Sequence, residues 1–265
     1  MSGSILFEQS DQVGWVTISH VPRFNAMSRG MWRELRCVFE RADRNPDLRC
    51  VVVAGEGANF CAGGDISEYT EFRFQEASLR EFHEVDVWGG LQAMLACDLP
   101  IVAHIEGNCM GAGMEIACCC DIRVAGMSAR FGAPIARLGF PMAPREVELM
   151  LREVGPSLAR QMLLEAAVFS ASDMLAARFL SRIPADKQVA AEVLATASRI
   201  VSLAPQAARL NKRTLRALAG HSGAVGEAVA TEPTPGLQST SYSYADSAEH
   251  REGILAFLEK RKPSF

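Results

Sequence analysis

The sequence predicts an α/β protein with a mainly parallel sheet, followed by a helical C-terminal region. Three observations lead to this fold class. Short apolar strands, glycine-rich turns and helical patterns alternate through the first two-thirds of the 265 residues. From about residue 144 onward the pattern is nearly all helical. The composition, 49% hydrophobic and 22% charged, is that of a globular chain long enough to bury a sizeable core.

The first elements are a hairpin and a helix. Val13, Trp15 and Thr17 alternate with Val16 and Ile18, after the run ILFE at 5–8 and a polar turn at residues 10–12, and this pattern predicts a β-hairpin. Ser28 then precedes a helical pattern that runs through Phe39. A serine directly before such a pattern favours an N-cap at this position.

The remaining elements follow from run length and spacing. We expect strands at 48–54, 100–106 and 121–125, and helices at 67–97, 111–120, 187–204, 205–218 and about 246–260. The stretch at 231–240, rich in Pro, Gly, Ser and Thr, is the one break in composition. We predict a core unit of residues 1–200 and a helical C-terminal unit of residues 201–265.

The composition argues against several classes of protein. The formal net charge is −4, from 27 basic and 31 acidic residues, whereas broad nucleic-acid binding requires a concentrated basic face. No apolar stretch approaches the roughly 18 residues of a membrane-spanning helix, and the N-terminus does not read as a signal peptide. The eight cysteines show neither zinc-ligand spacing nor a disulfide framework. We therefore expect a reduced, cytoplasmic protein without a metal site.

Two glycine-rich turns are candidates for function. The first, NFCAGGDI at 59–66, and the second, GNCMGAGME at 107–115, each follow a predicted strand, and neither has nucleotide-binding spacing. Both present backbone N–H groups at a strand end, and the second also opens a helix, where the N–H groups favour negative charge. Two such donors that face one point would form an oxyanion hole.

Glu115 adds an acid to the second turn. It lies three residues after Ala112, about one turn along and on the same helical face. Within the apolar run MEIACCC its carboxyl group would be largely dry, and burial raises the pKa of a carboxyl group. Glu115 is therefore a candidate general acid or base.

An ordered set of motifs resembles the crotonase superfamily, which includes enoyl-CoA hydratases and isomerases. The resemblance covers essentially the whole chain and is carried by PRFNAMS at 22–28, FCAGGDI at 60–66, residues 105–115, CDIR at 120–123, FGAP at 131–134, Gly139 and the tail EGILAFLEKRKPSF. It implies a spiral of ββα turns with a helical C-terminal trimerisation region, assembled as a homotrimer or as a hexamer of two trimers.

The resemblance also implies an activity in acyl-CoA metabolism, such as that of fatty acids. The substrate would be a CoA thioester, with coenzyme A entering as part of the substrate and no permanently bound cofactor. The thioester oxygen would lie in an oxyanion hole formed by the N–H groups of Gly64 and Ala112, and Glu115 would be the acid/base. The implied substrate- and CoA-binding residues are Arg23, Ala26, Ala62, Gly64, Asp65, Ile66, Ser67 and Ala112, with Lys260 or Lys262 of a neighbouring subunit as further candidates for the phosphates.

One departure from the family pattern limits the functional prediction. Hydratases of this family carry a second glutamate directly after the Phe-Gly-x-Pro stretch, where this sequence has Ile135. Isoleucine transfers no proton, so ordinary hydration is in doubt. Several functions stay open. They are a double-bond shift with one base, a hydrolase, decarboxylase or lyase reaction, and a weakly catalytic acyl-CoA-binding subunit.

Other residues could supply the second proton transfer. Glu146 and Glu148 follow Pro144, where acidic residues more often stabilise the first turn of a helix. His83 falls in the helix that covers the acyl pocket in relatives, and we expect an exposed histidine there rather than a catalytic one. Arg137 and Arg145 are expected to be solvated, although either could reach a substrate carboxylate.

Overall fold

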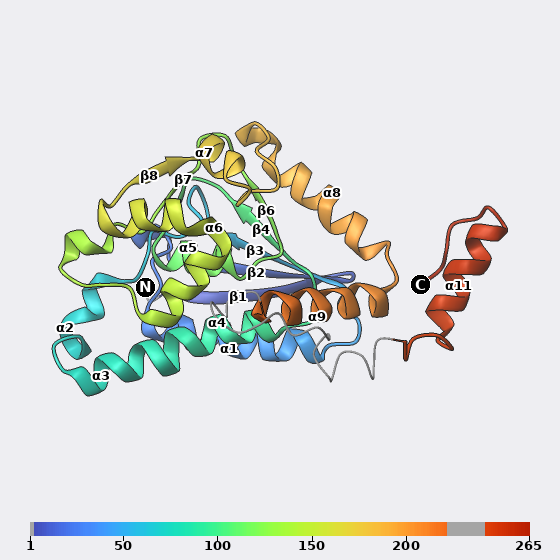
Figure 1. Cartoon of the computed structure of the whole chain (residues 1–265), viewed down its shortest axis with the longest axis horizontal. Coiled ribbons are helices and arrows are strands. Elements are labelled where there is room, and N and C mark those ends of the chain that lie inside the picture. The colour runs from blue at the N-terminus through green and yellow to red at the C-terminus, as the bar shows by residue number, and fades with distance from the viewer. Residues whose placement is uncertain (1–2, 222–241) are drawn as a thin grey trace.

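The computed structural model describes residues 3–221 and 242–265, and its central feature within these residues is a five-stranded sheet (Figure 1). In spatial order the strands are β1 (Ser4–Ser10), β2 (Val13–Ser19), β3 (Cys50–Gly55), β4 (Ile101–Ile105) and β6 (Ile122–Ala125). β1 and β2 form the predicted antiparallel hairpin, and the other neighbours are parallel. The α/β class and the strand predictions are thus confirmed.

Three short strands form a second, smaller sheet. It consists of β5 (Asn108–Met110), β7 (Arg130–Gly132) and β8 (Val168–Ser170). The expectation that the chain is nearly all helical after residue 144 is wrong at β8, which pairs antiparallel with β7. A three-residue strand is specified by its partner, because it is too short to show an alternating pattern of its own.

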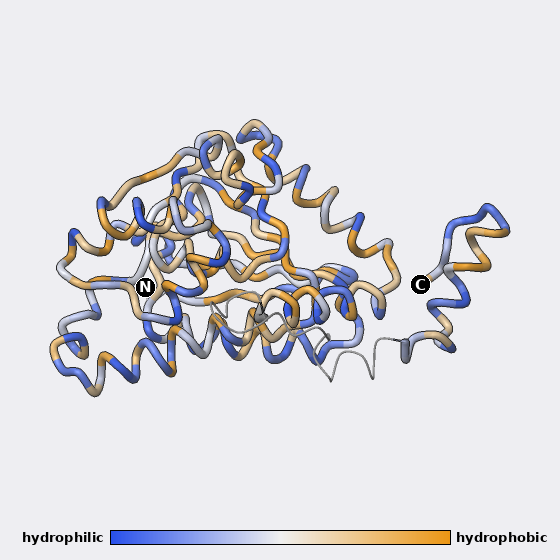
Figure 2. The backbone as a smooth tube through the Cα atoms, viewed as in Figure 1, coloured by the Kyte–Doolittle hydropathy of each residue, from blue (hydrophilic) through white to orange (hydrophobic). Residues whose placement is uncertain are grey.

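Both faces of the central sheet are covered. In β3, Val51 and Val53 belong to the main core, and Cys50 and Val52 pack instead against α8 (Val189–Val201). Successive side chains of a strand point to opposite faces, so a strand buried on both sides is apolar throughout. In Figure 2 the central strands are accordingly hydrophobic, whereas the outer helices alternate between hydrophobic and hydrophilic stretches.

The main core is closed by α1 (Arg29–Arg44) and α4 (Trp88–Ala96), which pack against each other along the lower edge of Figure 1. Ser28 is the N-cap of α1, as predicted, and its hydroxyl accepts a hydrogen bond from the N–H of Met31 at 3.3 Å. The apolar stripe of α1, including Leu35 and Phe39, is fully buried.

The segment predicted to be helical over 67–97 is helical, but it is divided into several short helices. It runs through a 3-10 turn (Ile66–Glu68), α2 (Tyr69–Phe72), α3 (Glu76–Glu81) and a π-helix (Phe82–Val87) into α4. Asp86 in the π-helix is almost completely buried and forms ion pairs with Arg29 at 2.5 Å and Arg33 at 2.6 Å. These ion pairs fasten the π-helix to α1.

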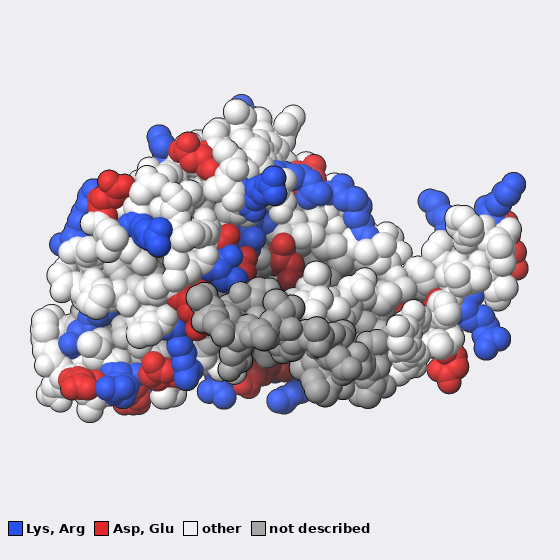
Figure 3. All heavy atoms as spheres, viewed as in Figure 1, with Lys and Arg blue, Asp and Glu red and all other residues white. Residues whose placement is uncertain are grey.

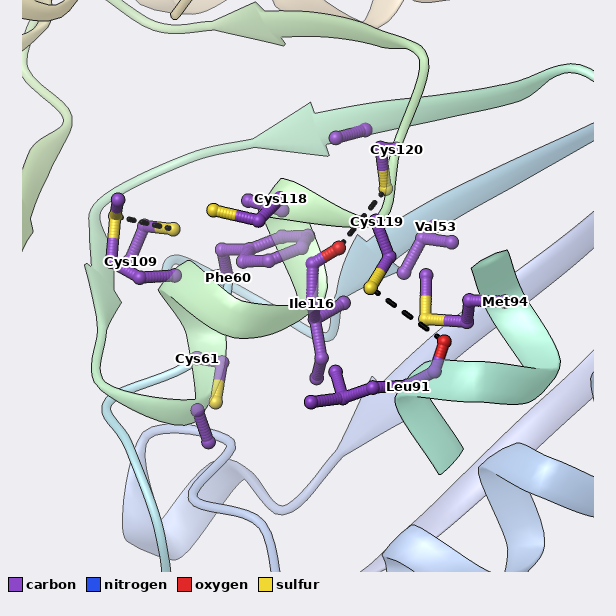
Figure 4. Packing of buried hydrophobic residues seen from close by; sticks show 14 of the residues in the cluster. Val53, Phe60, Cys61, Leu91, Met94, Cys109, Ile116, Cys118, Cys119 and Cys120 are labelled. Atoms are coloured by element: carbon purple, nitrogen blue, oxygen red, sulfur yellow. Dashed lines mark hydrogen bonds between the residues drawn. The ribbon is translucent and has the colours of Figure 1, made fainter. Parts of the chain in front are cut away.

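The next helices surround the second glycine turn. α5 (Ala112–Cys118) is wholly buried, and α6 (Pro144–Leu164) follows the 3-10 helix Pro134–Leu138. Directly after α5, the thiol of Cys119 contacts the carbonyl oxygen of Leu91 in α4, and that of Cys120 contacts the carbonyl oxygen of Ile116 (Figure 4). Every residue of α5 is buried, and its end is joined to α4 by the Cys119 contact.

The C-terminal third is mostly helical, with α7 (Ala171–Ala176), a 3-10 turn (Asp186–Gln188), α8, α9 (Pro205–His221) and α11 (Ala248–Leu258). α11 confirms the last predicted helix; it lies at the right of Figure 1, and its Glu249 accepts a hydrogen bond from the N–H of Gln206 in α9 at 2.8 Å. The composition break at 231–240 lies outside the described residues.

The surface and the helix lengths give two further findings. Basic and acidic side chains are interspersed over the visible face in Figure 3, in keeping with the small net charge. None of the helices in the described parts of the chain is long and apolar enough to cross a membrane.

Candidate active site

The two glycine turns meet at a pocket of about 330 Å³. Four segments and Trp32 of α1 line it; the segments are residues 62–66, residues 69–87, residues 110–115 at the start of α5, and residues 134–146. Its walls include the rings of Trp32, Tyr69, Phe82 and Phe140. The pocket is therefore mainly apolar, with a few polar groups inside, which is the usual constitution of a small-molecule site.

The N–H groups of Gly64 and Ala112 lie at this pocket without partners among the described residues. The N–H of Met27 donates to the carbonyl of Gly63 and the N–H of Asp65 donates to the carbonyl of Met27, each at 2.8 Å. Backbone N–H groups alternate in direction along such a pairing, so the N–H of Gly64 points away from Met27. Ala112 is the first residue of α5, and its N–H has no carbonyl one turn earlier to bond.

Close packing explains the glycines of both turns. A Cβ atom at residue 64 would collide with the Tyr69 hydroxyl, and one at residue 113 would lie 2.6 Å from the carbonyl oxygen of Cys61. Gly111 has a φ of 48°, a conformation that glycine adopts without strain. The glycines thus allow a helix start and a strand end to approach the same point.

Glu115 is buried in the first turn of α5 and lines the pocket. No described residue donates a hydrogen bond to its carboxyl group. Burial, and secondarily the negative charge of Glu146, raises the pKa of Glu115 well above its ordinary value, while Arg73 acts in the opposite direction. The carboxyl group therefore tends to carry a proton, as expected from its position in the sequence.

Glu146 shares the pocket with Glu115. It does lie in the first turn of α6, but its side chain is only 5% exposed, whereas its neighbour Glu148 is exposed. One of its carboxylate oxygens, Oε1, lies 2.8 Å from Nδ1 of His83. The expectation of an exposed histidine at residue 83 is wrong, because the π-helix directs this ring into the pocket, where its side chain is 16% exposed.

Arg73 extends this network, and the sequence reasoning missed it. Its Nη2 lies 3.3 Å from Nε2 of His83, and its guanidinium is stacked 4.2 Å from the ring centre of Tyr69 and 3.7 Å from that of Phe140. Tyr69 was missed as well. The four-residue spacing of Tyr69 and Arg73 on a helical segment was the available signal that the two side chains share a face.

The remaining predicted binding residues divide between two hollows. Ala62, Gly64, Ile66 and Ala112 line the pocket with Glu115, whereas Arg23, Asp65 and Ser67 line a neighbouring hollow of about 300 Å³ on the other side of the same loop. There the Asp65 carboxylate accepts hydrogen bonds from the N–H of Ser67 at 3.0 Å and from its hydroxyl at 2.7 Å. Ala26 is buried and lines neither hollow, and Lys260 and Lys262 are exposed beyond α11.

Ile135 and the cysteines provide no catalytic group. Ile135 lines the pocket and packs on the core, so the wall is apolar at the position where hydratases of the family carry the second glutamate. All eight cysteines are free, and seven of them are buried, Cys37 being exposed. Burial raises the pKa of Cys61 to about 12, which keeps this thiol from acting as a thiolate nucleophile. Within residues 3–221 and 242–265, no group of three or more His, Cys, Asp or Glu side chains could hold a metal ion.

The fold and the pocket together define the class of protein. A solved enoyl-CoA hydratase/carnithine racemase from Magnetospirillum magneticum has the same fold, with a TM-score of 0.91 at 33% identity over 98% of this chain and 94% of that one. A probable enoyl-CoA hydratase of Mycobacterium bovis is 28% identical over 265 residues, and a crotonyl-CoA hydratase of Syntrophomonas wolfei is 28% identical over 274 residues; each match covers 99% of this chain and 97% of the relative. The architecture is that of the crotonase superfamily.

The family follows from a match along the sequence. The model of the enoyl-CoA hydratase/isomerase family matches residues 8–265, nearly the whole chain. The chain therefore belongs to the enoyl-CoA hydratase/isomerase family, whose enzymes act on acyl-CoA thioesters.

Proposed function

We propose that this protein is an acyl-CoA-processing enzyme that passes through a thioester enolate, with Glu115 as acid/base. The observation that carries the proposal is the meeting of a buried carboxyl group with two unpartnered N–H groups in one pocket. A thioester carbonyl bound by the N–H groups of Gly64 and Ala112 would become an enolate when the α-carbon loses a proton. Donors fixed in advance stabilise that developing charge more strongly than they stabilise the neutral carbonyl.

The pocket supports a role for Glu115 at the α-carbon. Its carboxyl group is held by no other side chain of the described residues, so both oxygens are available to the substrate. A carboxyl group whose pKa is raised above its ordinary value is a stronger base toward a carbon acid than an ordinary carboxylate is. Transfer of a proton to or from the α-carbon through the enolate is the step that isomerase and lyase reactions share in this proposal.

Ile135 favours a second candidate within the same fold. Because the wall at this residue is apolar, hydrolase, decarboxylase or other lyase chemistry, or a weakly catalytic acyl-CoA-binding subunit, are the alternatives. Product analysis with a panel of acyl-CoA thioesters separates them, since each reaction releases a different product.

CoA binding and assembly complete the proposal. Coenzyme A would enter as part of the substrate, with the thioester end beside Ala62 and Ile66 and the rest near Arg23, Ala26, Asp65 and Ser67. Residues 201–265 would form the oligomerisation region of a homotrimer or of a hexamer built from two trimers.

The test is proton exchange at the α-carbon. We expect the wild type to exchange the α-protons of butyryl-CoA for deuterium in D₂O, and Glu115→Gln to lower the exchange rate by about 10²–10⁴-fold while still binding the thioester. Exchange is followed by mass spectrometry and binding by calorimetry. Exchange at the wild-type rate in Glu115→Gln would contradict the role of this residue, and failure of the wild type to bind any acyl-CoA in a panel would contradict the proposed function itself.

A further inference from the structure

The pocket holds a second acid that the proposed reaction has not used. Glu146 approaches from α6, and Glu115 from α5, and the charge of Glu146 acts on Glu115. A glutamate whose only role is to stabilise the first turn of a helix can remain in solvent, as Glu148 does two residues later. Burying a carboxylate is unfavourable unless it is hydrogen-bonded, so its burial here needs a reason.

We propose that Glu146 is the second catalytic carboxylate of this pocket, held in place by His83 and Arg73 as positioning residues. This inference rests on the proposed function, because it assigns the proton transfer that Glu115 leaves open. Glu146 would then take the role that Ile135 cannot perform, from a different wall of the same pocket.

The hydrogen-bond chemistry fixes the state of the network. Arginine only donates, so Nε2 of His83 must accept from Nη2 of Arg73 across 3.3 Å. The single proton of a neutral imidazole is then on Nδ1, which donates to Oε1 of Glu146 across 2.8 Å. Glu146 is thus an acceptor, and its second oxygen, Oε2, receives no hydrogen bond from a described residue and is not sealed from the pocket. That oxygen is free to accept a proton from a substrate or a water molecule.

The positioning residues are themselves held firmly. The Arg73 guanidinium lies against the rings of Tyr69 and Phe140, which meet edge to face, and it makes a cation–π contact with each. His83 belongs to the π-helix that Asp86 fastens to α1. π-helical turns often occur at functional sites, and this one sets the histidine toward the pocket while keeping Asp86 buried.

The two carboxyl groups consequently have different roles in proton transfer. Glu115 shares the pocket with Tyr69 of α2, Arg73 of the following turn and Glu146 of α6, and no described residue donates a hydrogen bond to its carboxyl group. The groups around Glu146 are His83, Arg73 and Glu115. Glu146 accepts a hydrogen bond from His83, whereas Glu115 receives none from a described residue and its raised pKa favours the protonated form. Two carboxyl groups in such different surroundings are suited to act as a base and an acid.

With an α,β-unsaturated thioester the step balances as the addition of water. Glu146 takes a proton from water as the water oxygen bonds to the β-carbon, and the electron pair of the double bond moves to form the enolate. Glu115 then gives its proton to the α-carbon. Afterwards Glu146 is protonated and Glu115 is charged, and one proton transferred from Glu146 to Glu115, directly or through solvent, restores the resting state.

The experiment compares Glu146→Gln with Glu148→Gln, an exposed glutamate on the same turn. Each variant is assayed for hydration of a panel of straight, branched and aromatic α,β-unsaturated acyl-CoA thioesters and for α-proton exchange of butyryl-CoA. We expect Glu146→Gln to lower hydration of the best substrate about 10²–10⁴-fold but to retain exchange, and Glu148→Gln to keep both rates within about twofold. In Glu146→Gln the acidic limb of the exchange profile should move to lower pH, because the charge that raises the pKa of Glu115 is gone.

A second pair of variants tests the positioning of Glu146. The amide of His83→Asn can still donate to Glu146 from near the position of Nδ1, whereas His83→Phe cannot. We expect His83→Phe to lower kcat for hydration at least tenfold with little change in KM, and His83→Asn to recover part of that loss.

The outcomes separate the two proposals. Unchanged hydration in Glu146→Gln, equal loss of hydration and exchange in that variant, or a wild type that exchanges α-protons but hydrates no member of the panel would overturn the role of Glu146 while leaving the enolate proposal standing. Absence of exchange in the wild type would overturn the enolate proposal first.

Discussion

The two acids of the pocket stand on walls that are built by different means. Glu115 projects from α5, a short helix surrounded by core side chains, and its carboxyl group has no hydrogen-bond donor among the described residues. Glu146 projects from the exposed start of α6 and is tied to His83 and, through it, to Arg73. The contrast shows how one residue type meets two environments within a single cavity: the carboxyl group of Glu115 is buried without a hydrogen-bond donor, and that of Glu146 is buried but hydrogen-bonded.

The walls also differ in how they are stabilised. On the wall of Glu115, Ile116 belongs to the same buried core as Leu91 and Met94 of α4, and the thiol of Cys119, directly after α5, contacts the carbonyl oxygen of Leu91 (Figure 4). The opposite wall includes residues 66–87, a chain of short helices in which Phe72, Phe82 and Val87 pack on the core and Asp86 forms ion pairs with α1. We therefore expect substitutions on the first wall to affect folding most and those on the second to affect turnover most.

The largest effect on stability is expected for Ile116→Ala. Ile116 is fully buried, so truncation removes apolar contacts and leaves a cavity under the helix that carries Glu115. The free energy of unfolding should fall by about 2–5 kcal/mol, measured by urea denaturation. A loss below about 1 kcal/mol would mean that α5 is not anchored by the core.

Asp86→Asn should have a smaller effect on stability. The side chain of Asp86 is 2% exposed and accepts from two arginines, but these are 24% and 58% exposed and can turn to solvent. We expect a loss of about 1–3 kcal/mol in the free energy of unfolding. Turnover per folded molecule should fall as well, since the same π-helix carries His83. Undiminished turnover in the folded variant would show that the π-helix does not need this anchor.

Glu84→Gln, two residues earlier in the π-helix, is the matched control. Glu84 is 40% exposed and pairs with Arg145, which is 52% exposed, at 3.4 Å. A solvent-exposed ion pair contributes little, so both stability (within about 0.5 kcal/mol) and turnover should stay close to wild type. A large loss of stability or turnover in Glu84→Gln would show that the exposed charge of Glu84 matters as much as the buried charge of Asp86.

The wall of Glu115 could be predicted from the sequence, because its parts are neighbours in the chain. A strand, a glycine turn and a short apolar helix fix where Ala112 and Glu115 lie relative to each other. The hairpin and the N-cap at Ser28 were predicted for the same reason, since their signals are local.

The second wall could not be predicted in the same way. The hydrogen bond between His83 and Glu146 joins residues 63 positions apart, and nothing local shows which face of either helix meets the other. The π-helix adds to the difficulty, because its wider turn shifts the face on which His83 lies relative to a regular helix. Arg73 follows α2 in a turn, where a charged residue is ordinarily expected in solvent.

The proposed chemistry requires that the carboxyl group of Glu115 is buried without a hydrogen-bond donor, and the pH dependence of stability tests this without any substrate. Because the pKa of Glu115 is raised in the folded state, the folded protein holds a proton that the unfolded chain releases above about pH 4.5. Through this group, stability therefore falls as the pH rises from 4.5 through the folded-state pKa.

The direct measurement is the free energy of unfolding of wild type and Glu115→Gln by urea denaturation across that range. The difference, variant minus wild type, should grow steadily in favour of the variant as the pH rises, and the growth should be smaller when both proteins also carry Glu146→Gln. A difference that stays constant with pH, or that shifts in favour of the wild type, would contradict the claim that this pocket holds Glu115 as the proton donor.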